Sequence, residues 1–155
     1  MTTIAWDGTT LAADKRCTIG GVQHTISKIR RGKTGNLVGY AGNCTLGERV
    51  LSALCEGAEW PDAQADKHDF CAVMEITPDG QCLKHERFGS FIVEDECFAI
   101  GSGADFALMA MHLGKSASEA VELASRFDTA SGNGVDTLTL MPETPKRRSP
   151  ARRRR

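Results

Sequence analysis

Short apolar runs separated by turn signals fill the first 41 residues, and this pattern restricts the segment to β-structure. Residues 3–6 and 9–13 form the first two runs, and the Asp7-Gly8 dipeptide between them is typical of a hairpin turn. Further strands are predicted over residues 22–29 and 37–41. Because each such strand has an apolar face to bury, the chain needs a second layer to pack against it.

A helix is predicted over residues 45–56, where apolar side chains recur at helical spacing. Thr45 and Glu48 have the spacing of a capping box at its start, and Gly57 is a typical helix stop.

The rest of the chain continues the β-structure and then adds two more helices. Residues 70–77 and 81–88 flank the turn Pro78-Asp79-Gly80, which predicts a hairpin. A second capping box is formed by Ser116 and Glu119. The other predicted elements are strands over 91–93 and 97–100, helices over 105–112 and 117–127, and a closing strand over 135–141. This order predicts an α+β domain of two β layers with helices outside each.

Charged residues are unevenly distributed along the 155-residue chain. Seven of the 19 lysines and arginines lie in the last ten residues, which leaves 12 basic against 20 acidic side chains in the remainder. A body this acidic is a poor nucleic-acid binder, because phosphate contacts need clustered cations. The tail over residues 142–155 is rich in proline and arginine and is predicted to be flexible, so the folded domain is assigned to residues 1–141.

The six cysteines do not form a zinc or dithiol motif, because no pair has C-x-x-C spacing. The first residues lack the basic segment and apolar stretch of a signal peptide, and no apolar run is long enough to span a bilayer. These features predict a reduced, cytoplasmic protein that has neither a metal site nor a membrane partner.

Thr2 is a candidate nucleophile, because a residue this small allows the initiator methionine to be trimmed. Trimming leaves an α-amine beside the threonine hydroxyl. The hydroxyl is a weak nucleophile that needs a base, and an α-amine with a pKa of about 7.7–8.0 accepts a proton near neutral pH. One residue can therefore supply both groups, although a threonine at position 2 is common and by itself carries no such meaning.

Several segments follow Thr2 in a characteristic order. They are Asp14, Lys28, Tyr40-Ala41-Gly42, Gly101-Ser102-Gly103 and Asp128-Thr129-Ala130-Ser131-Gly132. Over roughly residues 2–141 this order and spacing resembles the β-type subunits of proteasomes and the HslV peptidases, and most of all the short bacterial, betaproteobacterial-type proteasome homologues. The stretch from Thr2 to Asp14 is slightly shorter than in those families, at a hairpin where a loss is tolerable.

The resemblance implies a four-layer αββα sandwich of the N-terminal nucleophile hydrolase type and a threonine-type endopeptidase. It assigns catalytic roles to Thr2, Asp14, Lys28, Ser102, Asp128 and Ser131. Lys28, held by Asp14, would lower the pKa of the Thr2 hydroxyl and α-amine. The backbone N–H of Gly42 would stabilise the oxyanion.

The same resemblance implies where substrate binds and what else the site contains. The substrate-binding residues would be Cys17, Thr18, Ile26, Arg30, Tyr40 and Cys44. Thr18 and Gly42 would pair with the substrate backbone as an added strand. No cofactor is expected, and the carbonyls around Ser125, Asp128 and Ser131 match a position where relatives can hold a structural cation.

Identical subunits are the expected partners, in a stacked double ring of seven subunits per ring or, alternatively, six. The segment 104–112 is apolar almost all round and the helix 45–56 has a similar face, so one small domain is expected to have too little core to cover both. Peptides or unfolded proteins would be the substrates, and an ATPase unfoldase is a candidate partner. Two alternatives stay open, namely a non-proteolytic amidase of the same nucleophile class and a weakly active structural ring.

Overall fold

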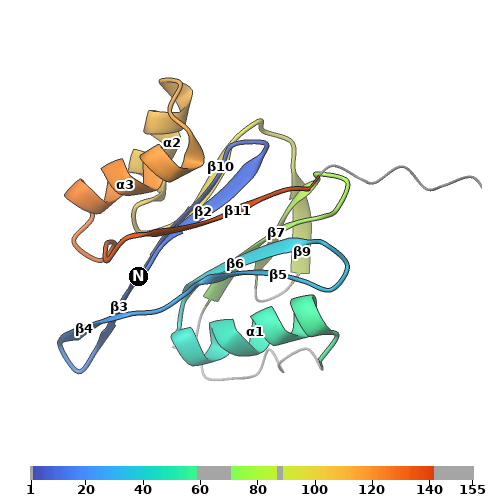
Figure 1. The fold of residues 1–155 in the computed structure, drawn as a ribbon, viewed down its shortest axis with the longest axis horizontal. Helices are drawn as coiled ribbons and strands as arrows, with labels where there is room; N and C mark the ends of the chain where they lie inside the picture. Colours follow the sequence, from blue (N-terminus) through green and yellow to red (C-terminus); the bar gives the residue numbers. More distant parts are fainter. Residues whose placement is uncertain (1, 59–70, 87–88, 142–155) are drawn as a thin grey trace, which may run out of the picture.

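The computed structural model describes residues 2–58, 71–86 and 89–141 and places them in four stacked layers (Figure 1). The predicted loop around 59–68 and the predicted flexible tail lie outside these residues. The first sheet contains, in spatial order, β10 (Phe98–Gly101), β1 (Thr3–Trp6), β2 (Thr10–Asp14) and β11 (Val135–Thr139). The second contains β5 (Ile29–Arg31), β6 (Leu37–Gly42), β7 (Cys71–Ile76), β8 (Cys82–Glu86) and β9 (Gly89–Val93). Neighbouring strands are antiparallel in both sheets.

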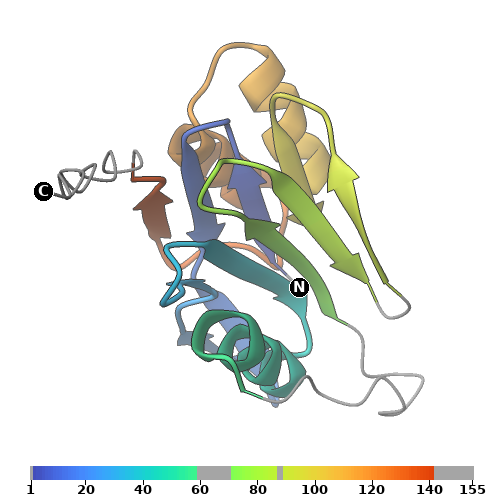
Figure 2. The ribbon, with the colours of Figure 1, turned by 90° about the vertical axis from the view of Figure 1, so that its right-hand side faces the viewer.

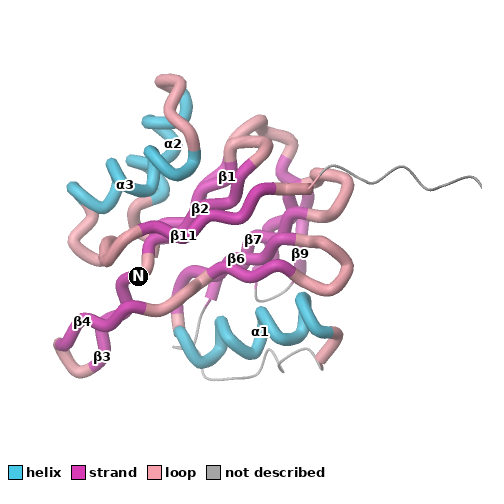
Figure 3. The backbone as a smooth tube through the Cα atoms, viewed as in Figure 1, coloured by secondary structure: helices cyan, strands magenta, loops and turns pink. Residues whose placement is uncertain are grey.

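Helices cover the outer face of each sheet. α1 (Cys44–Glu56) packs on the second sheet, whereas α2 (Ala104–His112) and α3 (Ala117–Phe127) pack on the first, and Figure 2 shows these layers from the side. The predicted α+β class and αββα layering are confirmed. A separate hairpin of β3 (Arg16–Ile19) and β4 (Val22–Thr25) extends away from both sheets (Figure 3). None of the helices in the described part of the chain is long and apolar enough to cross a membrane.

Three apolar clusters fill the spaces between the four layers, and the alternation of side chains along each strand divides the residues among them. In β1, Ile4 and Trp6 belong to the cluster between the two sheets, whereas Ala5 belongs to the cluster beneath α2 and α3. In β6, Leu37 and Ala41 face the first sheet, and Val38 lies in the cluster under α1. The central strands of each sheet are therefore buried on both faces, whereas β9 at the edge of the second sheet is largely exposed.

The cluster beneath α2 and α3 is built mainly of alanine, which lets both helices approach the first sheet closely. Several large apolar side chains of this helix pair point away from the sheet, and Phe106, Met109 and Phe127 remain 43%, 68% and 63% exposed. The apolar face of α1 behaves differently, because Val50 and Leu51 are buried against the second sheet. The domain thus covers the apolar face of α1 and leaves that of the α2–α3 pair exposed, in line with the expectation that its core is too small to cover both.

Two local predictions were wrong. α1 begins at Cys44 and is capped by Asn43, whose side chain accepts a hydrogen bond from the Leu46 N–H, so Thr45 is not its cap. The predicted strand 22–29 is broken into β4, which belongs to the separate hairpin, and β5, which belongs to the second sheet. The break lies before Lys28, whose side chain turns inward while its carbonyl accepts a hydrogen bond from the Tyr40 N–H. The strand β3 was not anticipated. In contrast, the Gly57 helix stop and the Ser116–Glu119 capping box are confirmed.

Replacing Asn43 with alanine removes the hydrogen bond that caps α1. We expect Asn43→Ala to lower the free energy of unfolding by about 1 kcal/mol. The matched control Thr45→Ala changes an exposed residue and should shift stability by less than about 0.5 kcal/mol. Denaturant unfolding measures both values, and a larger loss from Thr45→Ala would contradict the assignment of the cap.

Candidate active site

The centre of the site is an ion pair buried beside the start of the described chain. Asp14 ends β2 and Lys28 directly precedes β5. The Lys28 Nζ lies 2.9 Å from Asp14 Oδ1, and the two side chains are only 1% and 0% exposed. Removing two charges from water is costly, so an ion pair in this position contributes little net stability. The pair nevertheless holds a fixed positive charge inside the protein, next to β1.

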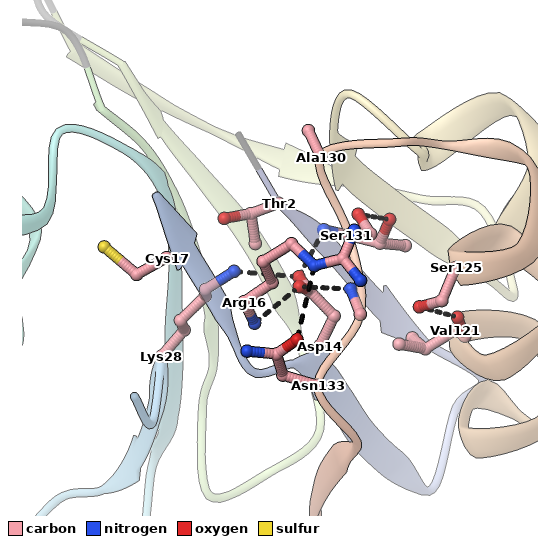
Figure 4. A network of polar contacts seen from close by, with 12 residues as sticks. Thr2, Asp14, Arg16, Cys17, Lys28, Val121, Ser125, Ala130, Ser131 and Asn133 are labelled. Atoms are coloured by element: carbon pink, nitrogen blue, oxygen red, sulfur yellow. Dashed lines mark hydrogen bonds and ion pairs between the residues drawn. The ribbon is translucent and has the colours of Figure 1, made fainter. Parts of the chain in front are cut away.

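The Asp14 carboxylate also joins three other segments of the chain (Figure 4). Its Oδ1 accepts a hydrogen bond from the Thr3 N–H at 2.9 Å. Its Oδ2 accepts hydrogen bonds from the N–H groups of Arg16 and Gly132, both at 2.9 Å. One carboxylate thus connects the N-terminal strand, the start of β3 and the turn that follows α3. This set of donors balances the negative charge that the fold has buried.

A second hydrogen-bonded network adjoins the first at Thr3 and beside Gly132. Asp128 terminates α3, and its Oδ2 accepts hydrogen bonds from the hydroxyls of Ser131 at 2.6 Å and Ser102 at 2.7 Å. Because Ser131 uses its proton in this way, the Thr3 hydroxyl donates to Ser131 Oγ, at 2.7 Å. Burial raises the pKa of Asp128, but the hydrogen bonds from Ser131 and Ser102 outweigh it, so the pKa lies below its ordinary value. The carboxylate is therefore ionised at neutral pH.

Thr2 lies beside the second network, where its carbonyl oxygen is 3.5 Å from the Ser102 hydroxyl, and it is only 2% exposed. In the view of Figure 4 it is drawn between Cys17 and Ser131. The Gly-Ser-Gly segment explains how the chain comes so close. A Cβ on Gly101 would lie 1.9 Å from the Thr2 carbonyl oxygen, and a Cβ on Gly103 would lie 2.0 Å from Thr3 Oγ1. Both glycines are therefore required by the approach of the N-terminal strand.

Gly42 reaches the same region from the second sheet. It is the last residue of β6, and its φ of 130° belongs to a backbone conformation that favours glycine. Gly101 lies against Thr2, and a Cβ on Gly101 would also be 3.3 Å from the methyl group of Ala41, the residue before Gly42. The end of β6 is thus next to the start of β1.

Three of the six predicted substrate-binding residues meet at the start of α1. The thiols of Cys17 and Cys44 lie 3.1 Å apart. Tyr40 packs its ring on Gly47, where any Cβ would lie 2.1 Å from the ring. Burial, followed by the charge and hydrogen bond of Cys44, raises the pKa of Tyr40, so its hydroxyl stays neutral.

The other three lie around this group. Thr18 is exposed on the β3–β4 hairpin, and Ile26 is half-buried between β4 and β5. The guanidinium of Arg30 pairs with Glu48 and Glu56 of α1.

Arg16 is a site residue that the sequence reasoning missed. Its guanidinium donates to the carbonyl of Thr129 at 2.8 Å and to the side chain of Asn133 at 3.3 Å. A Cβ on Gly132 would lie only 2.4 Å from this guanidinium, which explains the glycine at that position. The chain thus places its own cation against the turn after α3. Thr3 was missed as well, although its alternation with Thr2 in a strand indicates that it faces the opposite side.

The predicted structural cation would use carbonyl groups of this same turn. The carbonyl of Asp128 accepts a hydrogen bond from the Ser131 N–H at 3.1 Å, and the hydroxyl of Ser125 donates to the Val121 carbonyl. Among the described residues, no group of three or more histidine, cysteine or acidic side chains could hold a metal ion. A cation bound by carbonyl oxygens stays a prediction.

Comparison with known proteins links this arrangement to one fold. No protein-family model matches the chain, and no curated protein matches it in sequence. BPH of Thiobacillus denitrificans matches in structure with a TM-score of 0.68 at 20% identity, over 92% of this chain and 99% of that one. The same protein in complex with epoxomicin matches with a TM-score of 0.67 at 20% identity, over 91% and 99%.

HslV from Trypanosoma brucei matches with a TM-score of 0.65 at 19% identity, over 89% of this chain and 97% of that one. These likenesses extend over nearly the whole length of both partners. The chain therefore has the fold of the proteasome β-subunits and the HslV peptidases, as the order of its motifs predicted.

Proposed function

We propose that this protein is a threonine-type endopeptidase that uses Thr2 as its nucleophile after Met1 is removed. The observation that carries the proposal is the buried Lys28–Asp14 pair, which lies beside the first strand and is 1% and 0% exposed. Charges that are buried away from water are often found at functional sites, because they shift the pKa of neighbouring groups. The structural likeness to BPH in complex with epoxomicin supports the same reading.

The proposed chemistry begins with the free α-amine and the hydroxyl of Thr2. The positive charge of Lys28 favours the deprotonated forms of both groups. The hydroxyl oxygen attacks the peptide carbonyl, and its proton passes to the α-amine. Collapse of the tetrahedral intermediate breaks the C–N bond, and the departing amine takes that proton. Water then hydrolyses the acyl-enzyme ester, so the reaction requires no cofactor.

Three hydroxyl or carboxylate side chains and one backbone N–H would support these steps. The ionised Asp128, with Ser131 and Ser102, would orient the Thr2 amine through hydrogen bonds. The Gly42 N–H would stabilise the oxyanion. Substrate backbone would pair with Thr18 and Gly42 as an added strand.

The substrate side chain would enter the space around Cys17, Tyr40 and Cys44, with Ile26 and Arg30 at its edges. Peptides and unfolded proteins are the proposed substrates.

Assembly into a cytoplasmic double ring is also proposed, with seven subunits per ring. The exposed apolar side chains of the α2–α3 pair support it, because Met109 and Phe127 are 68% and 63% exposed. Leu113 at the end of α2 is 78% exposed. These exposed apolar side chains come from one helix pair rather than from scattered positions. Such a surface is suited to burial against further copies of the chain. An ATPase unfoldase would deliver substrates to the chamber.

A non-proteolytic amidase is the second candidate function, because the Thr2 chemistry would act equally on a small acyl amide. Cleavage of an internal bond in an extended peptide supports the endopeptidase, whereas turnover limited to small acyl amides supports the amidase.

Removal of Met1 and modification of Thr2 test the nucleophile. Intact-mass analysis should show a chain that begins at Thr2, and epoxomicin should add to that residue alone. Thr2→Ala should abolish both the adduct and peptide cleavage, whereas Thr45→Ala, an exposed change on α1, should retain them. Full activity in a chain that keeps Met1 would contradict the mechanism.

Lys28→Met should lower peptide cleavage by about a hundredfold or more, because the charge that activates Thr2 is lost. Lys15→Met is the matched control, since Lys15 pairs with Asp136 and is 30% exposed. Its cleavage rate should change little. Circular dichroism shows whether each variant is folded, and Lys28→Arg retains the charge if Lys28→Met does not fold. Near-normal cleavage by folded Lys28→Met would overturn the role of Lys28.

The ring is tested by light scattering coupled to size exclusion. The purified protein should have a mass many times that of the 16.7 kDa chain. Met109→Asp should reduce this mass, because it places a charge on the exposed apolar face of α2. The control Lys33→Asp changes an exposed residue on the loop after β5 and should not reduce it. A monomer as the only species at micromolar concentration contradicts the ring.

A further inference from the structure

Two cysteines from distant parts of the sequence bring their thiols together beside the proposed active site. Cys17 lies on β3, and Cys44 is the first residue of α1. Their sulfur atoms are 3.1 Å apart in a hydrogen bond, with both thiols reduced. Cys17 is buried at 6% exposure, whereas Cys44 is only partly buried, so small molecules can reach the pair from the side of Cys44.

Only a short movement separates the two sulfur atoms from bonding distance. A disulfide needs a sulfur–sulfur distance of about 2.05 Å, so the two atoms have to approach by only about 1 Å. The segment that carries Cys17 can supply this movement. β3 pairs with β4 in an isolated two-stranded hairpin, and all four residues of β4 are exposed. The hairpin is held at its base, where Arg16 and Thr25 contact Asn133, but two-stranded hairpins are otherwise marginally stable and adjust easily.

The charges around Cys17 act in opposite directions. Burial, together with the neighbouring Cys44, raises the pKa of the Cys17 thiol, while the charge of Lys28 partly offsets this effect. The Cys17 thiol is therefore protonated at rest. Oxidation will be faster at alkaline pH, because the thiolate is the reactive form.

We propose that Cys17 and Cys44 form a reversible disulfide that closes the substrate pocket when the protein meets a peroxide. In the first step, the sulfur of the more exposed Cys44 attacks hydrogen peroxide, which leaves a sulfenic acid and one water. The Cys17 sulfur then attacks the sulfenic sulfur, the S–S bond forms, and a second water departs. The two thiols lose two electrons and two protons, and the peroxide gains them. A dithiol reductant reverses the reaction.

The location of the pair explains why such a bond would stop catalysis, an effect that rests on the proposed function. Figure 4 shows Cys17 on the side of the site where Lys28 and Thr2 lie. Cys44 comes two residues after Gly42, the proposed oxyanion donor. Drawing the sulfurs together moves the β3 segment towards the start of α1, across the proposed substrate side-chain pocket. A displacement of about 1 Å near reacting groups costs up to about a hundredfold in rate.

The test treats the full, purified protein with hydrogen peroxide and follows two independent readouts. Peptide mapping without reduction should show a Cys17–Cys44 cross-link, and two free thiols should disappear. Peptide cleavage should fall by about tenfold or more and should return after dithiothreitol. Cys17→Ser and Cys44→Ser should each lose this response, so that their treated and untreated rates are equal. Cys97→Ser removes a thiol just before β10 and should keep it.

The outcomes separate this inference from the proposed function. Absence of the cross-link in a folded protein overturns the disulfide. A cross-linked protein that cleaves peptide at an unchanged rate overturns the closure of the pocket. A protein that forms the cross-link but cleaves no peptide when reduced supports the disulfide and overturns both the proposed function and the closure. If one serine variant fails to fold, the other variant and the wild-type mapping still decide the question.

Discussion

The buried carboxylate of Asp14 is the constraint on which the rest of the site depends. It accepts hydrogen bonds from Thr3, Arg16, Lys28 and Gly132, which come from four separate segments of the chain. Placing a carboxylate in this interior is unfavourable unless all of these donors arrive together. The positions of β1, β3, the Lys28 segment and the turn after α3 are thus coupled through one residue. The same coupling fixes a positive charge beside the proposed nucleophile.

The four-layer architecture makes this coupling feasible. The central strands of each sheet are buried on both faces, so strand alternation sends one set of side chains to the core between the sheets and the other set beneath the helices. At the ends of β1 and β10 the apolar alternation gives way to polar residues and glycine. Thr2, Thr3 and Gly101 meet there without a side chain between the two strands. Asp14 and Gly42 end strands, and Thr2, Lys28, Ser102 and Asp128 each lie directly beside the end of a strand or helix.

Local signals in the sequence predicted the features that depend on local structure. Gly57 ends α1 and Ser116 caps α3 because the residues that they contact are close in sequence. The failures involve distant partners. Asn43 competes with Thr45 as a cap and prevails because β6 ends at Gly42, which fixes where the helix starts. The apolar pattern over 22–29 looks continuous, and only Asp14 draws Lys28 inward and breaks it.

The candidate site could be predicted only through the resemblance to a known family. Lys28 and Asp128 by themselves look like an ordinary strand end and helix end. The role of Arg16 depends on Gly132 and Thr129, which are more than a hundred residues away, and no spacing rule connects them.

The central claim is that Lys28, held by Asp14, tunes the Thr2 amine. Competitive labelling of that amine with acetic anhydride across a range of pH measures its pKa directly in the mature protein. The account predicts a value well below the ordinary range of about 7.7–8.0 and a return to that range in Lys28→Met. An ordinary value in the unaltered protein, unchanged by Lys28→Met, would contradict it.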